Sequence, residues 1–394
     1  MDESSNLGTV FYTTCNQDST SLAVGTNVGY KLFSLKSVHK LSKIYEQNDN
    51  EAIEIVEQYY SSYLVVRVYS SSPNTLSCWN YDKKSEMCKY IYRSKILAVK
   101  MNRMRIVTSL EGTFWIHQFS NFLQPKPFSY NPTWNPQGLF ALSNNTEKSY
   151  LAYPASNTTG EIQIFDTVNM CPELWITAHE TPIAALIFNS SGNMLATAST
   201  KGTRIRVFDV ENGKKLFEFI RGLKRYVSIS SMTFSENSQF LCVSSETETV
   251  HVFKLSNPSE NTEQGWLSYL GIGEQYSPGC FLYSRAFAIA RLPNAGAKTI
   301  CTITSIQHIL YILVASTNGY LYIYNLEPNT GGECRFFKQY RIDGMFYLSV
   351  PRSTISLRKL GCDDIINHYY YCVQYNNKEY SAWGSFLTRH GYGK

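Results

Sequence analysis

One arginine in the sequence stands between two sets of polar residues that suit the binding of an anion. Arg221 belongs to the tetrapeptide 219–222, Phe-Ile-Arg-Gly. The set that follows it consists of Ser244, Ser245, Thr249 and His251. The set that precedes it consists of His179, Ser199, Lys201 and Thr203. A guanidinium is a rigid fork of donors that matches phosphate, and hydroxyl groups complete the shell around such an anion. We therefore predict a phosphate site on Arg221 and the following set, whereas the preceding set should face Ile220, which carries no charge.

Each of these hydroxyl groups, taken alone, has a simpler explanation. Ser and Thr side chains in strands and turns commonly bond the backbone beside them. Two matching sets that flank one arginine are harder to explain in this way, so we keep the binding hypothesis.

The sequence contains no assembled catalytic or metal-binding motif. It lacks a Gly-x-x-x-x-Gly-Lys-Ser/Thr loop, a His-Glu-x-x-His motif, a nucleophile elbow and paired carboxylates in a shared turn. Its seven histidines are scattered singly, and its ten cysteines form no Cys-x-x-Cys pair. We expect a protein that is not an enzyme, with no cofactor, no metal site and reduced cytoplasmic thiols.

Composition favours a β-rich protein without a membrane span. Charged residues make up only 17% of the 394 residues, whereas tyrosine (29) and phenylalanine (21) are abundant. The net charge of +5 comes from scattered basic residues, so nucleic acid is not an expected partner. The longest apolar run, 309–315, is too short to cross a bilayer, and the polar residues 1–6 do not resemble a signal peptide. Any membrane contact is therefore expected to be peripheral.

A repeated strand pattern predicts the fold. Aligned on their second apolar strand, the copies have anchors at Phe33, Trp79, His117, Phe165, Phe208, Phe253 and Tyr324. The first five intervals are 38 to 48 residues and the last is 71. Because a four-stranded blade takes about 40–45 residues and must stack on its neighbours, we predict an all-β, seven-bladed propeller over 8–350. The alternative is a β-sandwich with chance periodicity.

The long last interval predicts an insertion at about 256–298. Its polar, proline-containing start is followed by four closely spaced apolar residues: Trp266, Leu267, Tyr269 and Leu270. Such a loop inserts its apolar tip into a membrane interface or, alternatively, folds back over a blade edge. The remaining segment, 351–394, is predicted to be a C-terminal tail that is partly disordered or adds one strand.

The stretch 195–255 resembles the phosphoinositide-binding β-propellers called PROPPINs, and among them the animal WIPI branch. The match runs from about 16 to 344 and is also dense in three further segments: 296–301, 318–326 and 331–334. The family signature is Phe-Arg-Arg-Gly, in which each arginine anchors one lipid headgroup on its own side. The resemblance therefore implies an intact headgroup site in blade 6 around Arg221. It also implies a degenerate site in blade 5, where Ile220 stands in place of the first arginine.

The resemblance implies a function as well as a site. It suggests an effector that binds phosphatidylinositol 3-phosphate, and also the 3,5-bisphosphate, at the periphery of preautophagosomal, endosomal or lysosomal membranes. Such a protein would act as a scaffold in autophagosome formation or endolysosomal traffic. The alternative is a divergent propeller that has lost useful lipid binding and serves as a protein–protein adaptor.

The resemblance also implies a groove for a protein partner between blades 2 and 3. In the family this groove receives an acidic segment of the scaffold protein that recruits the autophagy conjugation complex. Arg103 and Arg105 are the matching residues here. The alternative for both is ordinary solvated charge at a strand end.

Overall fold

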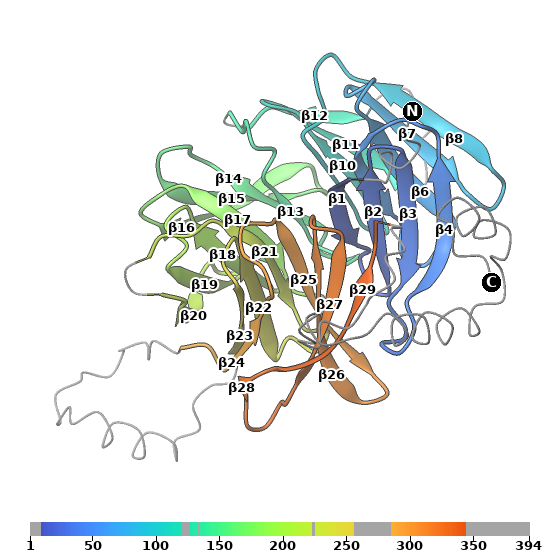
Figure 1. Ribbon diagram of the computed structural model, residues 1–394. Helices are drawn as coiled ribbons and strands as arrows, with labels where there is room; N and C mark the ends of the chain where they lie inside the picture. Colours follow the sequence, from blue (N-terminus) through green and yellow to red (C-terminus); the bar gives the residue numbers. More distant parts are fainter. Residues whose placement is uncertain (1–8, 120–126, 133, 223–224, 256–284, 344–394) are drawn as a thin grey trace, which may run out of the picture. The chain divides into compact units, whose positions relative to one another are not determined.

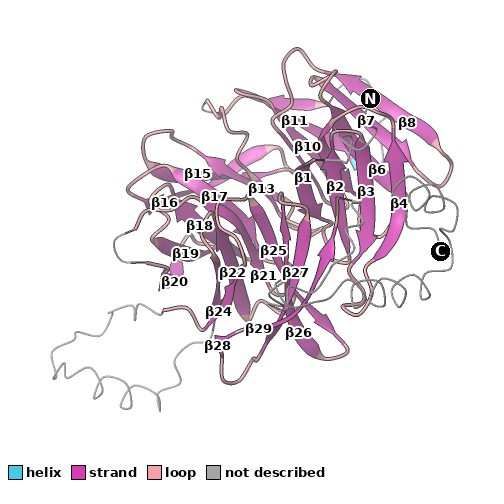
Figure 2. Ribbon diagram, viewed as in Figure 1, coloured by secondary structure: helices cyan, strands magenta, loops and turns pink. Residues whose placement is uncertain are grey.

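The computed structural model describes residues 9–119, 127–132, 134–222, 225–255 and 285–343 (Figure 1). The chain divides into two compact units, 1–345 and 346–394, and the second lies outside the described residues. In the described part of the first unit, strands form seven sheets, which we call blades 1 to 7 in chain order (Figure 2).

Each blade is built from four strands that follow one another along the chain and pair antiparallel. Blades 1 and 2 contain β1 (Val10–Cys15), β2 (Ser21–Thr26), β3 (Gly29–Ser34), β4 (Ser42–Asn48), β5 (Ile53–Gln58), β6 (Leu64–Tyr69), β7 (Thr75–Asn80) and β8 (Ser85–Ile91). Blades 3 and 4 contain β9 (Ala98–Met101), β10 (Arg105–Ser109), β11 (Phe114–Gln118), β12 (Phe128–Tyr130), β13 (Ala141–Leu142), β14 (Tyr150–Pro154), β15 (Gly160–Asp166) and β16 (Cys171–His179). Blade 5 contains β17 (Ile183–Phe188), β18 (Met194–Ser199), β19 (Arg204–Asp209) and β20 (Lys215–Ile220).

The last two blades interlock through one short strand. Blade 6 contains β21 (Ile229–Phe234), β22 (Phe240–Ser245), β23 (Thr249–Lys254) and β24 (Ala288–Arg291). Blade 7 contains β25 (Thr299–Ile306), β26 (Ile309–Ser316), β27 (Tyr320–Leu326) and β29 (Arg335–Arg341). Between β27 and β29, the chain forms β28 (Gly332–Glu333), which pairs parallel with β24 and thereby covers the outer edge of blade 6. This covering is one way to protect an exposed sheet edge.

The seven-bladed prediction is confirmed. All seven anchor residues lie in the third strand of successive blades, from Phe33 in β3 to Tyr324 in β27. Their regular spacing therefore reflects one strand position repeated around the propeller.

Hydrophobic clusters between neighbouring blades hold the ring together. In β2, Leu22 and Val24 pack toward blade 7, where they meet Leu313 of β26, whereas Ala23 packs toward blade 2. Successive residues of a strand face opposite sides, so each blade supplies apolar side chains to two interfaces. Equivalent clusters join each pair of consecutive blades, and the one between blades 7 and 1 closes the ring.

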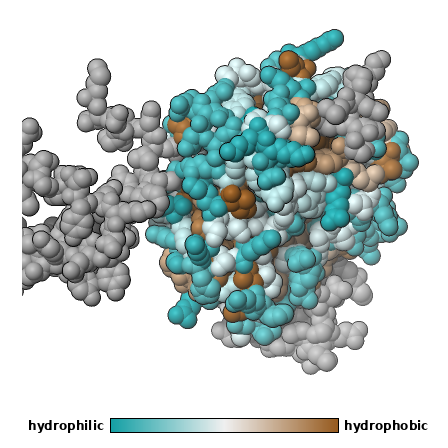
Figure 3. All heavy atoms as spheres, turned by 90° about the vertical axis from the view of Figure 1, so that its right-hand side faces the viewer, coloured by the Kyte–Doolittle hydropathy of each residue, from teal (hydrophilic) through white to brown (hydrophobic). Residues whose placement is uncertain are grey.

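The predicted insertion at 256–298 contains regular blade structure in its second half. β24 is the fourth strand of blade 6 and pairs with β23. Residues 256–284, which include the four apolar residues of the predicted membrane loop, lie outside the described residues, as does the predicted tail at 351–394. The surface of the face shown in Figure 3 is largely hydrophilic, with scattered hydrophobic residues.

Candidate functional site

The tetrapeptide 219–222 is fixed by the packing of its first residue. Phe219 is buried at the end of β20, and its ring stacks on that of Phe253 in blade 6, with centroids 4.8 Å apart. The backbone N–H of Arg221 donates to the carbonyl oxygen of Thr203 at 2.9 Å. Because side chains alternate along a strand, Phe219 faces blade 6 whereas Ile220 faces the crevice toward blade 4. Arg221 therefore follows the end of β20, with blade 6 on one side of the motif and blade 4 on the other.

Arg221 begins a chain of hydrogen bonds that runs along blade 6. Its Nη2 donates to Ser245 Oγ at 2.7 Å and to Thr247 Oγ1 at 2.8 Å. The two hydroxyl groups lie 2.9 Å apart, and Thr247 Oγ1 is 3.2 Å from Thr249 Oγ1. Thr249 Oγ1 in turn lies 3.1 Å from Nε2 of His251. The structure therefore brings together Arg221 and three of its four predicted neighbours.

The electrostatics of this group suit an anion. Arg221 Nε and His251 Nδ1 are buried without a hydrogen-bond partner in the described part of the chain. Burial, and next the nearby Arg225, lower the pKa of Arg221, while burial and the charge of Arg221 lower the pKa of His251 to about 4. His251 is therefore neutral near pH 7, and in the described part of the chain no carboxylate forms an ion pair with the Arg221 guanidinium, which lies among hydroxyl groups. Such preorganised donors match a phosphate oxygen.

Two residues of blade 6 differ from the sequence prediction. Ser244 is fully buried, and its Oγ donates to the carbonyl oxygen of Thr299 at 3.2 Å, so it does not join the Arg221 group. Ser244 and Ser245 are adjacent in β22 and must face opposite sides of the blade. Thr247, which the prediction omitted, contacts Arg221 directly. The signal for it was the alternation of polar residues at 245, 247, 249 and 251.

We expect Thr247→Val to weaken binding of phosphatidylinositol 3-phosphate vesicles about fivefold, because one hydrogen bond worth ~1 kcal/mol is lost. The valine keeps the branched shape but leaves one Arg221 contact unmade. Thr233→Val in β21 is a suitable control, since its hydroxyl bonds only the neighbouring carbonyl of Phe234 in the described residues. Equal vesicle binding by both variants would contradict a role for Thr247.

The predicted residues of the blade 5 crevice lie near one another but are organised differently. His179 Nε2 lies 2.9 Å from Thr197 Oγ1, and burial, followed by the charge of Arg206, lowers the pKa of His179 to about 4. Ser199 is buried at the end of β18, and Lys201 Nζ lies 3.8 Å from Oε2 of the exposed Glu180. Thr203 contributes its carbonyl oxygen to the Arg221 backbone rather than a side-chain contact.

A buried carboxylate that the sequence analysis missed lies at the centre of this crevice. Glu218 has a side chain only 1% exposed and forms ion pairs with Arg204, Arg206 and Lys215. Burial acts to raise the pKa of Glu218, but hydrogen bonds from Lys215, Arg204 and Arg206 outweigh it and lower the pKa to about 2. The carboxylate is thus ionised and surrounded by cations. The sequence pattern gives no signal for this cluster, because it depends on which residues face one another across strands.

The two arginines predicted for the partner groove are not equivalent. The guanidinium of Arg103 is exposed and lies over the ring of Tyr60, 5.1 Å from its centroid. Arg105 is only 8% exposed, and its Nε donates to the carbonyl oxygen of Thr167 at 2.9 Å. Arg105 therefore joins blades 3 and 4 from inside, which corrects the prediction that it meets a partner at the surface.

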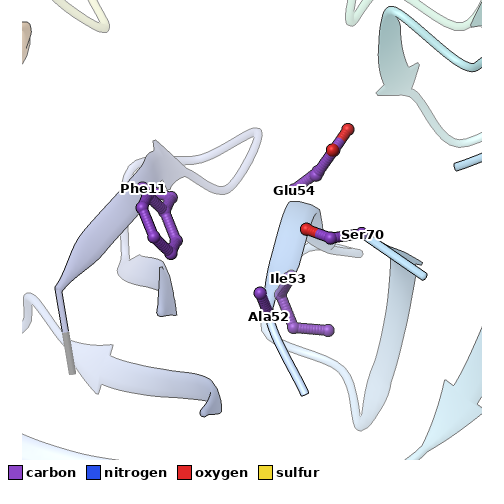
Figure 4. Close-up of a pocket in the computed structure, with 5 residues that line it drawn as sticks. All are labelled: Phe11, Ala52, Ile53, Glu54 and Ser70. Carbon is purple, nitrogen blue, oxygen red and sulfur yellow. The ribbon is translucent and has the colours of Figure 1, made fainter. Parts of the chain in front are cut away.

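A separate hollow of about 410 Å³ lies between blades 1 and 2 (Figure 4). It is lined by Phe11, Ala52, Ile53, Glu54 and Ser70. Its carboxylate, Glu54, is already paired with Lys95 at 2.8 Å. None of the predicted site residues contributes to it. Within the described ranges, no group of three or more His, Cys, Asp or Glu side chains is placed to hold a metal ion, and no helix could span a membrane.

Comparison with known proteins identifies the family. A family model described as PROPPIN matches residues 9–342. "WD repeat domain phosphoinositide-interacting protein 2" of Gallus gallus is 47% identical over 86% of this chain and 80% of its own length. "Autophagy-related protein 18" of Caenorhabditis elegans is 34% identical over 86% of this chain and 87% of its own length. The solved structure of Kluyveromyces lactis Hsv2 has the same fold, with a TM-score of 0.68 at 21% identity, covering 85% of this chain and 99% of that one. Because the family model and both relatives cover most of its length, this chain belongs to the PROPPIN family.

Proposed function

We propose that this PROPPIN binds phosphatidylinositol 3-phosphate, and also the 3,5-bisphosphate, at the periphery of preautophagosomal, endosomal or lysosomal membranes. It would act there as a scaffold without enzymatic activity, in autophagosome formation or endolysosomal traffic. The names of the two relatives refer to phosphoinositide interaction and to autophagy, which supports the general assignment.

The observation that carries the proposal is the arrangement around Arg221. One half-buried guanidinium donates to two hydroxyl groups, and its Nε has no hydrogen-bond partner in the described residues. A phosphate group on an inositol ring would accept from the guanidinium and the hydroxyl groups together. Blade 6 supplies these groups from β22, β23 and the turn between them, so the site is held by a packed sheet.

We expect Arg221→Ala to reduce flotation with phosphatidylinositol 3-phosphate vesicles tenfold to a hundredfold, because a charge-assisted contact is worth about 1.5–3 kcal/mol. Wild-type protein, the variant and lipid-free samples are compared side by side. Arg291→Ala is the matched control: Arg291 is in the same blade and carries the same charge, but its Nε pairs with Glu333 at 3.1 Å. Retained binding in Arg221→Ala would refute the proposed site.

One observation favours a second candidate function. Ile220 stands where the family signature has an arginine, which lowers the positive charge of the crevice toward blade 4. If the wild-type protein fails to float with the vesicles, the protein acts instead as an adaptor for other proteins. The exposed Arg103 beside Tyr60 is then the first surface to test for an acidic partner segment.

A further inference from the structure

Two cysteines of blade 2 lie directly opposite each other in neighbouring strands. Cys78 of β7 is paired with Cys88 of β8 in the antiparallel register, and both thiols are free. Both side chains pack on the cluster between blades 2 and 3, so the two sulfurs lie on the same side of the sheet. Paired residues of antiparallel strands have Cα atoms about 4.5 or 5.5 Å apart, within the range of roughly 4.4–6.8 Å that a disulfide spans. The backbone therefore holds the two thiols at a separation that a disulfide can bridge.

The outer strand can make the small adjustment that an S–S bond requires. Cβ atoms of a cross-strand pair lie about 4.5–5.5 Å apart, whereas a disulfide brings them to about 3.5–4.5 Å. The register shifts immediately beside the pair, where Trp79 is opposite Glu86 and Met87 has no residue opposite it. Such a bulge interrupts the ladder of hydrogen bonds. In the described part of the chain β8 pairs with β7 alone, so it can approach Cys78 without breaking other strand pairing.

The two thiols also contact each other, and this contact favours the reactive form. Burial, the largest cause, raises the pKa of the Cys15 thiol to about 12. At Cys78, by contrast, a hydrogen bond from Cys88 outweighs burial and lowers the pKa, while the same contact raises the pKa of Cys88. The thiolate is the nucleophilic form of cysteine. One thiolate of the pair therefore forms more readily than at an isolated buried cysteine.

A second pair of contacting thiols shows why access to solvent matters. Cys242 and Cys301 form a hydrogen bond between blades 6 and 7, but they are only 0% and 5% exposed. In blade 2, Cys78 is buried as well, whereas Cys88 is half-buried in the outermost strand. A small oxidant in solution can therefore reach the blade 2 pair through Cys88, and it cannot reach the other pair.

We infer that Cys78 and Cys88 are the site of a reversible disulfide, formed by a peroxide, that fastens the outermost strand of blade 2 to its neighbour. The thiolate of the pair attacks one oxygen of the peroxide, the O–O bond breaks, and the departing oxygen takes up a proton and leaves as water. The second sulfur attacks the resulting sulfenic acid, the S–O bond breaks, and a second water leaves. In total the two thiols lose two electrons and two protons, and one hydrogen peroxide becomes two waters. A thiol reductant reverses the step by thiol–disulfide exchange.

Peptide mapping of the full-length protein tests the site. The folded protein is treated with hydrogen peroxide, free thiols are blocked with iodoacetamide as the chain is unfolded, and the chain is digested with trypsin. Lys83 and Lys84 lie between the two cysteines, so trypsin separates them unless a disulfide joins the two peptides. We expect the peptide 85–89 to be linked to the peptide that contains Cys78, and dithiothreitol to release it.

Two substitutions and a matched control identify the linked residues. Cys88→Ser, on the outer strand, should abolish the link, and Cys78→Ala should abolish it as well. Cys171→Ser removes an exposed cysteine of blade 4 and should leave the yield of the link at its wild-type value. Cys242 and Cys301 should remain alkylated in all four proteins. Thermal unfolding reports whether each variant is folded.

Hydrogen exchange measures the consequence for the strand. After oxidation, the amides of β8 should exchange more slowly than in the reduced protein, because the disulfide closes a loop and opposes fraying of an edge strand. The amides of β4, the outermost strand of blade 1, are the control and should exchange equally in both states.

The test contains no lipid, so its failure leaves the proposed function standing, and failure of the proposed function leaves this inference standing. Sulfinic or sulfonic acid at Cys88 with Cys78 still alkylated would overturn the site. Oxidation of Cys171 at a peroxide concentration that leaves both blade 2 thiols alkylated would overturn it as well. A linked peptide whose β8 amides exchange as in the reduced protein would overturn the fastening of the strand.

Discussion

Phe219→Ala is expected to lower the free energy of unfolding by about 3–5 kcal/mol, because a fully packed aromatic ring is replaced by a cavity. Phe219 is only 2% exposed, and its ring lies between those of Phe217 and Phe253, with centroids 5.9 Å and 4.8 Å away. It belongs to the cluster that joins blades 5 and 6. The cavity would therefore form at the joint from which Arg221 extends, and vesicle binding should weaken together with stability.

Denaturant unfolding of Phe219→Ala measures this loss, and Phe336→Ala is the matched control. Phe336 is a phenylalanine of blade 7 that is 48% exposed, so its removal should change the unfolding free energy far less. Phe219→Leu should recover part of the loss by refilling the cavity. A loss in Phe219→Ala no larger than in the control would show that the ring does not secure the joint.

The fold was predictable because one strand position repeats. The third strand of each blade carries a bulky ring side chain at a fixed place, which is His117 in blade 3 and an aromatic residue in the others, so its spacing appears directly in the sequence. The end of the predicted insertion at 298 was harder to place. β24 lies within the predicted range and is only four residues long, so the sequence did not distinguish it from a loop.

The site was predictable only along single strands. Side chains alternate between the two faces of β22 and β23, which places Ser245, Thr249 and His251 on the face of Arg221. The same alternation places Ser244 on the opposite face from Ser245. The ion pairs of Glu218 with Arg204 and Arg206 could not be predicted from the sequence, because they depend on the register between β19 and β20. Register is set by hairpin geometry and by packing of the whole blade.

The expectation for Arg105 came from the family resemblance, which implied that Arg103 and Arg105 line one groove for a protein partner. In the structure, only Arg105 lies in β10, and Arg103 lies in the turn before it. The turn redirects the chain, so one side chain reaches solvent and the other reaches a carbonyl oxygen of blade 4.

The second large effect is expected at the buried carboxylate of blade 5. Glu218→Gln should lower the free energy of unfolding by about 3 kcal/mol, because it removes the buried negative charge with which Arg204, Arg206 and Lys215 form ion pairs. This expected loss is at the lower end of the range for breaking a buried ion pair, because the side chains of Arg204, Arg206 and Lys215 are partly exposed and water can solvate them. The glutamine keeps the size of the side chain, so the change isolates the charge.

The pH dependence of this loss identifies its electrostatic origin. The pKa of Glu218 is lowered from 4.5 to about 2 in the folded protein, so the unfolded chain binds its proton first as the pH falls. The stability that Glu218 contributes is therefore complete above about pH 4.5 and disappears as the pH falls through 2. The difference in unfolding free energy between wild type and Glu218→Gln should stay constant from pH 7 to about pH 5 and shrink toward pH 2. Glu161→Gln is the control: the carboxylate of Glu161, at the start of β15, accepts a hydrogen bond from Thr159 Oγ1 at 2.8 Å, and its replacement should change the unfolding free energy little. A difference that does not change with pH would mean that Glu218 stabilises the fold through packing and not through its charge.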